Sequence, residues 1–378
     1  MTDGEYDVVV VGVGGMGSAT VYHLAERGLD VLGLERYDVP HAMGSSHGIT
    51  RIIRRAYYEH PSYIPLIERA YDLWDDLKEE TGRPVIHRTG SIDAGPEGDV
   101  VFEGSLRSCE EHDIPHEVLT GAELNERFPG YDLPEDYRGL YQEDGGFVVP
   151  EQAIVGHTRA AQRAGATVRA REQVRDWTET PDGGVRVETD KGTYRADKLV
   201  LAAGSWNYKL TDALEGLAVP ERQVLAWFQP AVREQFAPEN FPVWNLSVPE
   251  GRFYGLPVYD VPGFKLGKYH HFDEQVDPDD WNRDPGPADE RLLRDFTEKY
   301  FPNGAGPTMR LATCMFTNSP DEHFILDTLP EHPQVAVGAG FSGHGFKFAS
   351  VIGEVLADLA ADGESDHPID MFSLDRFE

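Results

Sequence analysis

The hydrophobic pattern of this chain changes its period from one segment to the next. Residues 7–11 are a short apolar run rich in valine, which is typical of a strand buried on both faces. Residues 252–272 instead mix aromatic and polar positions between prolines, and this pattern predicts antiparallel strands. A third pattern has helical spacing and predicts a helix whose buried face is made by Leu66, Ile67, Ala70, Tyr71, Trp74 and Leu77.

The first apolar run opens a strand–turn–helix–strand unit of about thirty residues. Gly12, Gly14 and Gly17 have the spacing G-x-G-x-x-G, and the second strand ends at Glu35. Such glycines permit a tight turn, close approach of the backbone to a pyrophosphate and close packing of the helix. Glu35 is placed to accept hydrogen bonds from ribose hydroxyls, which disfavours NADP. The unit alone leaves FAD and NAD open.

Two further buried strands are predicted, one ending in "LVLAAG" and one beginning "QVAVGAG", with a helix after the second. Antiparallel patterns lie between them, and 378 residues exceed the usual size of one core. The sequence therefore predicts an α/β fold with an α+β insert, in which a Rossmann-like dinucleotide domain is discontinuous and the substrate domain is mainly antiparallel. The expected boundaries are 1–84, 148–216 and 322–378 for this dinucleotide-binding domain, and 85–147 and 217–321 for the substrate domain.

The chain is strongly acidic, with 66 acidic against 34 basic residues and a formal net charge of −32. Such a field repels nucleic acid and anionic membranes, so neither is an expected partner. It indicates a highly solvated surface suited to strong salt, as in the acidic proteome of a halophile. The N-terminus lacks the cationic start of a signal peptide, and no apolar run approaches the ~20 residues of a membrane helix, so we expect a cytoplasmic protein.

The two cysteines, Cys109 and Cys314, are too few for a disulfide framework or a cysteine-rich metal site, and we expect no metal. Cys109 lies in the polar segment "SLRSCEEHD" and is interpreted as filler or surface. From composition alone, Cys314 would also be interpreted as a core filler.

Together the motifs resemble those of the monomeric sarcosine oxidase and N-methyltryptophan oxidase family over nearly the whole chain. The resemblance rests on "VVVVGVGGMGSA", "GSSHGITRIIRRAY", "KLVLAAGSWN", "FYGLP", "KLGKYHH", "CMFTNSPDEHFILD" and "GFSGHGFKFAS". It implies FAD instead of NAD, and a flavin-dependent amine oxidase that acts on the C–N bond of secondary (N-methyl) amino acids. The implied products are an imine, hydrolysed to an amino acid and formaldehyde, and hydrogen peroxide from O2. It also favours a monomer.

The resemblance also implies a set of cofactor contacts. Cys314 would join the flavin covalently through a thioether, and His47 and Arg51 resemble a pair that lies against the flavin ring. The glycine turn before the last helix would bring backbone close to the flavin's pyrimidine side. The expected cofactor-binding residues are Gly12, Gly14, Gly17, Glu35, His47, Arg51, Gly204, Trp206, Cys314, Gly343, His344, Gly345 and Lys347.

Five residues are expected to act on the substrate or on oxygen. Matching positions suggest Arg54 and Lys347 as a cationic clamp for the substrate carboxylate. Lys265 resembles the family lysine near the flavin that serves oxygen activation, where a fixed cation stabilises developing negative charge. Tyr254 and His270 correspond to residues lining the pocket near the amine. An extra residue in "KLGKYHH" leaves His271 as the alternative to His270.

One departure bears on the substrate. Phe316 stands where sarcosine oxidases carry tyrosine, which makes the cavity more apolar and leaves room for a bulkier substrate. N-methyl-L-tryptophan, pipecolate or another cyclic imino acid is therefore the alternative to sarcosine. Three alternatives to an oxidase also remain at this stage: an NAD-dependent dehydrogenase, a flavin dehydrogenase with a non-oxygen acceptor such as a quinone, and a non-catalytic flavoprotein.

Overall fold

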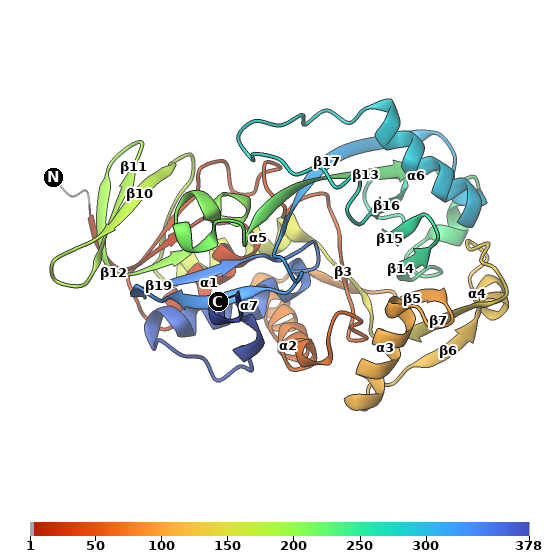
Figure 1. Cartoon of the computed structure of the whole chain (residues 1–378), viewed down its shortest axis with the longest axis horizontal. Helices are drawn as coiled ribbons and strands as arrows, with labels where there is room; N and C mark the ends of the chain where they lie inside the picture. Colours follow the sequence, from red (N-terminus) through yellow and green to blue (C-terminus); the bar gives the residue numbers. More distant parts are fainter. Residues whose placement is uncertain (1–3, 378) are drawn as a thin grey trace.

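The chain folds into two lobes, seen side by side in Figure 1, and the computed structural model describes residues 4–377. The sheet of the first lobe has eight strands. They are β1 (Gly4–Val11), β2 (Val31–Leu34), β9 (Thr167–Arg169), β10 (Val174–Glu179), β11 (Val185–Thr189), β12 (Thr193–Leu201), β18 (Ile325–Leu329) and β19 (His332–Ala339). β1 pairs in parallel with β12 and β2, and β12 pairs in parallel with β19. Their carboxyl ends therefore meet at one edge, where ligands of such sheets bind.

Four helices pack beside this sheet: α1 (Gly15–Glu26), α2 (Ile64–Thr81), α5 (Pro150–Arg163) and α7 (Ala349–Ala361). α1 contacts both α5 and α7, and α2 also packs on α7. The apolar stripe predicted for α2 is buried, and the helix ends at Gly82, whose positive φ of 66° suits a left-handed C-terminal residue. These helices and β-strands share one hydrophobic core.

The second lobe is built on another eight-stranded sheet, ordered β17-β13-β16-β15-β14-β5-β7-β6. In that order the strands are Thr308–Asn318, Val219–Phe228, Phe264–Lys268, Gly251–Leu256, Val243–Val248, Ser91–Pro96, Tyr137–Gln142 and Glu117–Thr120. Neighbours pair antiparallel except β14 and β5, which are parallel. The long strands β13 and β17 reach from this lobe toward the first (Figure 1).

Three helices belong to the second lobe: α3 (Val100–Glu111), α4 (Gly121–Arg127) and α6 (Pro287–Tyr300). A three-stranded sheet, β3-β8-β4, joins segments from distant parts of the sequence. Its strands are β3 (Arg51–Ile53), β4 (Ile86–Arg88) and β8 (Gly146–Val148). Short 3-10 turns occupy Pro61–Tyr63, Gly204–Lys209, Asp212–Leu214, Arg233–Phe236, Pro302–Gly304, Phe346–Phe348, Asp370–Phe372 and Leu374–Phe377.

This architecture confirms the predicted fold class, a Rossmann-like sheet with a mainly antiparallel companion. The domain boundaries themselves stay a prediction. They are supported by the strands, because the large sheets draw their strands from the two sets of ranges expected for the two domains. Within residues 4–377, no helix combines the length and apolarity needed to cross a membrane.

Candidate active site

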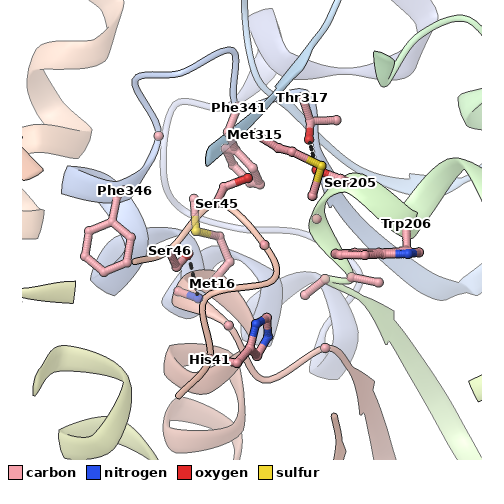
Figure 2. Close-up of a pocket in the computed structure, with 18 of the residues that line it drawn as sticks. Met16, His41, Ser45, Ser46, Ser205, Trp206, Met315, Thr317, Phe341 and Phe346 are labelled. Atoms are coloured by element: carbon pink, nitrogen blue, oxygen red, sulfur yellow. Dashed lines mark hydrogen bonds between the residues drawn. The ribbon is translucent and has the colours of Figure 1, made fainter. Parts of the chain in front are cut away.

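The turn between β1 and α1 is shaped to receive a phosphate group. Gly12 has a φ of 92°, and a Cβ on Gly17 would lie 1.8 Å from the Gly12 carbonyl oxygen, so neither position accepts a side chain. A Cβ on Gly14 would meet no described atom within 4 Å, which leaves open space at the N-terminus of α1. The N–H groups of the first helical turn face this kind of space and favour an anion there. Ser46 Oγ accepts one of them, the Gly15 N–H, at 3.3 Å (Figure 2).

Glu35 lies beside this turn at the end of β2. Its carboxylate accepts the backbone N–H of Val13 and that of Tyr37, both at 2.9 Å, and His41 Nε2 lies 3.3 Å away. Burial acts to raise the pKa of Glu35, but the hydrogen bond from His41 and the backbone bonds outweigh it, so the pKa is lowered and the group is an anion. An anionic acceptor at this point suits ribose hydroxyls.

A cavity of about 450 Å³ is lined by these groups and by residues of both lobes, with Glu35 and Lys347 both in its wall. This volume is in the range of cofactor and ligand pockets. Figure 2 shows residues from both lobes facing it, among them Ser205 and Thr317, whose hydroxyls are 2.8 Å apart. The glycine turn, the anionic Glu35 and a cavity lined by both lobes together fit an adenine dinucleotide.

Cys314 stands on β17 in the cavity wall, buried to 4% exposure. Arg51 NH2 lies 3.6 Å from its sulfur and also donates to the Ser45 carbonyl at 2.8 Å. The sulfur therefore lies in the cavity wall beside a guanidinium, the kind of electropositive surroundings in which reactive cysteines are found. His47 is buried close by, and burial together with the Arg51 charge lowers its pKa to about 3. Of the expected pair, Arg51 is thus the cation, and His47 is neutral.

The two residues of the expected carboxylate clamp both lie against the ring of Tyr57. Lys347 Nζ is 5.1 Å and Arg54 Cζ is 4.7 Å from the centroid of the Tyr57 ring. Lys347 lines the cavity, and its Nζ donates to the His344 carbonyl at 2.7 Å. Burial, followed by the charge of Arg54, lowers the pKa of Lys347 to about 7.

Arg54 is almost fully buried and is not among the residues that line the cavity. Its Nε donates to Asp93 at 3.1 Å and its NH2 to Glu59 at 3.1 Å. Burial acts to raise the pKa of Glu59, but the Arg54 charge outweighs it and brings the pKa to about 2. Arg54 NH1 is buried without a partner among residues 4–377, so one donor of the guanidinium remains for an anion.

Lys265 is buried on β16, behind the cavity wall, and does not point to water. Its Nζ donates to the carbonyls of Gly48 and Thr50 at 2.8 and 2.6 Å, and to Thr50 Oγ1 at 3.1 Å. Thr50 in turn lines the cavity. Burial, followed by the charge of Arg51, places the pKa of Lys265 well below its ordinary value.

Aromatic rings form the cavity wall where the substrate amine is expected. Tyr254 and Phe316 line it as anticipated, and Tyr269 stands between them, with ring centroids 5.0 Å from Tyr254 and 5.9 Å from Phe316. His270 lies outside the described wall, between Glu221 and Glu322, each 3.0 Å from one ring nitrogen. These two hydrogen bonds raise the pKa of His270 to about 9.

The alternative, His271, is buried on Asp289 at 3.0 Å and also lies outside that wall. The sequence analysis did not single out Tyr269, because it assigned the position near the amine to His270 or His271. The aromatic alternation of residues 252–272 was the signal available for it.

The glycine turn before α7 approaches the cavity as expected. Gly343 has a φ of 78°, and a Cβ there would lie 2.4 Å from the Phe316 ring. His344 Nε2 donates to the Glu322 carbonyl at 2.9 Å, and burial lowers its pKa to about 4. Gly345, Gly204 and Trp206 also line the cavity.

The remaining wall residues visible in Figure 2, which sequence reasoning did not single out, include Met16, His41, Ser45, Ser46, Ser205, Met315, Thr317, Phe341 and Phe346.

Comparison with known proteins agrees with this geometry. Residues 7–359 match the family of FAD-dependent oxidoreductases. The chain is 42% identical to a monomeric sarcosine oxidase of Bacillus sp. (strain B-0618), covering 98% of this chain and 96% of that protein. It is 36% identical to an N-methyl-L-tryptophan oxidase of Yersinia pestis (strain Pestoides F), covering 99% and 100%.

A solved structure of similar shape is that of NikD, described as an unusual amino acid oxidase essential for nikkomycin biosynthesis. The two structures align with a TM-score of 0.84 at 30% identity, over 98% of this chain and 97% of the other.

Proposed function

The chain belongs to the FAD-dependent oxidoreductase family, and we propose that it oxidises the C–N bond of a secondary, N-methylated amino acid. The observation that carries the proposal is the pairing of a flavin-sized cavity with two buried cations, Lys347 and Arg54, around Tyr57. Relatives named as sarcosine oxidase and N-methyl-L-tryptophan oxidase support the substrate class.

The cations would bind the substrate carboxylate. Lys347 offers its ammonium from the cavity wall, and Arg54 offers the unpartnered NH1. Charge-assisted hydrogen bonds of this kind are strong in a site shielded from water. They would hold the N-methyl group against the wall formed by Tyr254, Tyr269 and Phe316. Aromatic faces accept a methylated ammonium, and the cations nearby lower the amine pKa so that its neutral form can react.

Bound in the cavity, FAD would supply two-electron redox chemistry, with dioxygen as the final acceptor and hydrogen peroxide as the product. The protein would assist the oxygen step with Lys265, whose Nζ donates to three oxygens beside the wall, an arrangement that satisfies all three N–H groups of an ammonium and offsets its burial. The oxidised substrate is an imine, which water hydrolyses to the amino acid and formaldehyde. Sarcosine is the simplest substrate of this class, and Phe316 favours larger or cyclic ones, such as N-methyltryptophan or pipecolate.

We further propose a covalent link between the flavin and Cys314. It is supported by the position of the thiol in the cavity wall and by the Arg51 guanidinium, which lies 3.6 Å from the sulfur. Acid precipitation of the purified protein tests the link. The yellow colour should remain in the pellet for the natural protein and move to the supernatant for Cys314→Ser, while Cys109→Ser behaves like the natural protein. Colour in the supernatant for all three would contradict the link.

The function itself is tested by measuring peroxide with sarcosine, N-methyltryptophan, pipecolate and proline. We expect turnover with at least one N-methyl or cyclic amino acid, and a loss of kcat/KM of about 30-fold or more in Arg54→Met, because truncating one partner of a buried charge pair is costly. Peroxide from none of the four would refute the oxidase. We also propose that the protein is a cytoplasmic monomer adapted to strong salt, so the assay should be run at high ionic strength.

A further inference from the structure

A carboxylate outside the expected catalytic set holds the turn on which Lys265 depends. Glu151 lies in the first turn of α5, far from Lys265 in sequence. Its Oε1 accepts the backbone N–H of Gly48 at 2.8 Å and that of Ile49 at 3.1 Å. The same turn presents the carbonyls of Gly48 and Thr50 to Lys265 Nζ. Glu151 therefore binds two N–H groups of residues 48–50, and Lys265 binds three oxygens of the same residues.

The conformation of this turn is one that the chain does not adopt readily by itself. Gly48 has a φ of 94° and Ile49 a φ of 75°. A β-branched residue with positive φ is a genuine outlier and persists only where its surroundings enforce it. The two hydrogen bonds to Glu151 supply that enforcement, because they fix the direction of two successive N–H groups.

The turn also connects to the cavity. Thr50 and Arg51 line it, whereas Lys265 lies behind them. The charge of Lys265 thus acts on the cavity across Thr50, and its position is set by the oxygens of Gly48 and Thr50. A shift of the turn would move the ammonium, and displacements of about 1 Å at a reacting centre can cost about 100-fold in rate.

We propose that Glu151 is a positioning residue for the oxygen reaction, acting through the turn 48–50 on Lys265. This inference rests on the proposed oxidase function. The role proposed for Glu151 differs from the roles of the clamp and of the cofactor-binding residues, because Glu151 itself lies outside the described cavity wall. Its second oxygen, Oε2, is buried without a partner among residues 4–377. Within those residues, the hydrogen bonds that the carboxylate accepts are therefore the two from the turn.

The first test follows the turn directly and requires no turnover. Amide hydrogen exchange of a peptide spanning residues 48–50 is measured in the full chain, with and without FAD, for the natural protein, Glu151→Gln and Glu151→Ala. Glutamine keeps an oxygen in the same place, so residues 48–50 of Glu151→Gln should exchange at the same rate as in the natural protein. Alanine should make the peptide exchange at least about tenfold faster. Glu123→Ala, which removes a first-turn carboxylate of α4, is the matched control and should leave residues 48–50 unchanged.

The second test separates the two half-reactions. In Lys265→Met, reoxidation of the reduced flavin by O2 should slow by about 100-fold, with anaerobic reduction by substrate preserved. Glu151→Ala should slow reoxidation by about tenfold to 100-fold and Glu151→Gln by less than about threefold. Glu151→Ala added to Lys265→Met should produce no further loss, because both act on one cation.

Unchanged exchange of residues 48–50 in Glu151→Ala, or multiplying losses in the double variant, would overturn the inference. If Lys265→Met slows both half-reactions equally, the role of Lys265 in oxygen activation fails, and with it the effect assigned to Glu151 on that step. The exchange result still shows whether Glu151 holds the turn. Should the alanine variant not fold, Glu151→Asp serves instead, since a side chain one methylene shorter cannot reach both N–H groups and should give faster exchange and slower reoxidation.

Discussion

Individual buried charges around Tyr57 are balanced against one another. Arg54 is paired with Glu59 and Asp93, whereas Lys347, which also lies near the ring, lines the cavity. Lys347 therefore differs from an ordinary surface lysine, because burial and the Arg54 charge bring its pKa to about 7. Whether it binds a carboxylate is then decided by its protonation near neutral pH.

The pH dependence of carboxylate binding tests this residue. Lys347 is protonated below its pKa of about 7 and neutral above it, so the affinity for butyrate, which has no amine to titrate, should fall as pH rises. The expected loss approaches about tenfold per pH unit above the pKa, since one proton is linked to binding. Perturbation of the flavin spectrum by butyrate measures the affinity.

In Lys347→Met the affinity should be weak and nearly independent of pH. Lys299→Met, which alters an exposed ion pair with Glu250, should keep the natural profile. A Lys347→Met variant that retains the full pH dependence would exclude Lys347 as the titrating group.

At the level of elements, the sequence predicted well wherever local pattern and local chemistry coincide. The β1–α1–β2 unit is confirmed because its valine run, glycine spacing and terminal Glu35 all act within one short stretch. The buried stripe of α2 and the strand pair β15–β16 are confirmed for the same reason. Each of these elements reveals its buried positions through its own periodicity.

Elements that depend on distant partners were not predictable in this way. The parallel pairing of β14 with β5 and the small β3-β8-β4 sheet join segments whose own patterns do not specify a partner. The same limit applies to the site. Cys314, Lys347 and Tyr254, expected from the motifs, line the cavity, whereas His270 lies outside the described wall and Tyr269 forms part of it. Glu151 escaped notice because its partners lie about 100 residues earlier, as the separations of 103 and 102 positions indicate.

At the scale of the whole molecule, the cavity exists only because both lobes contribute to it. The first lobe supplies the glycine turn and Glu35, and the second supplies Cys314 and the aromatic wall. The central claim is therefore that this shared cavity couples oxidation of an N-methyl amino acid to reduction of O2.

Mixing the yellow protein with substrate under argon, and then admitting oxygen, tests that claim most directly. The account predicts that sarcosine, N-methyltryptophan or pipecolate bleaches the visible flavin absorbance, and that oxygen restores it with release of hydrogen peroxide. A flavin that keeps its colour with all three would contradict the claim. So would a bleached flavin that dioxygen fails to reoxidise while a quinone does.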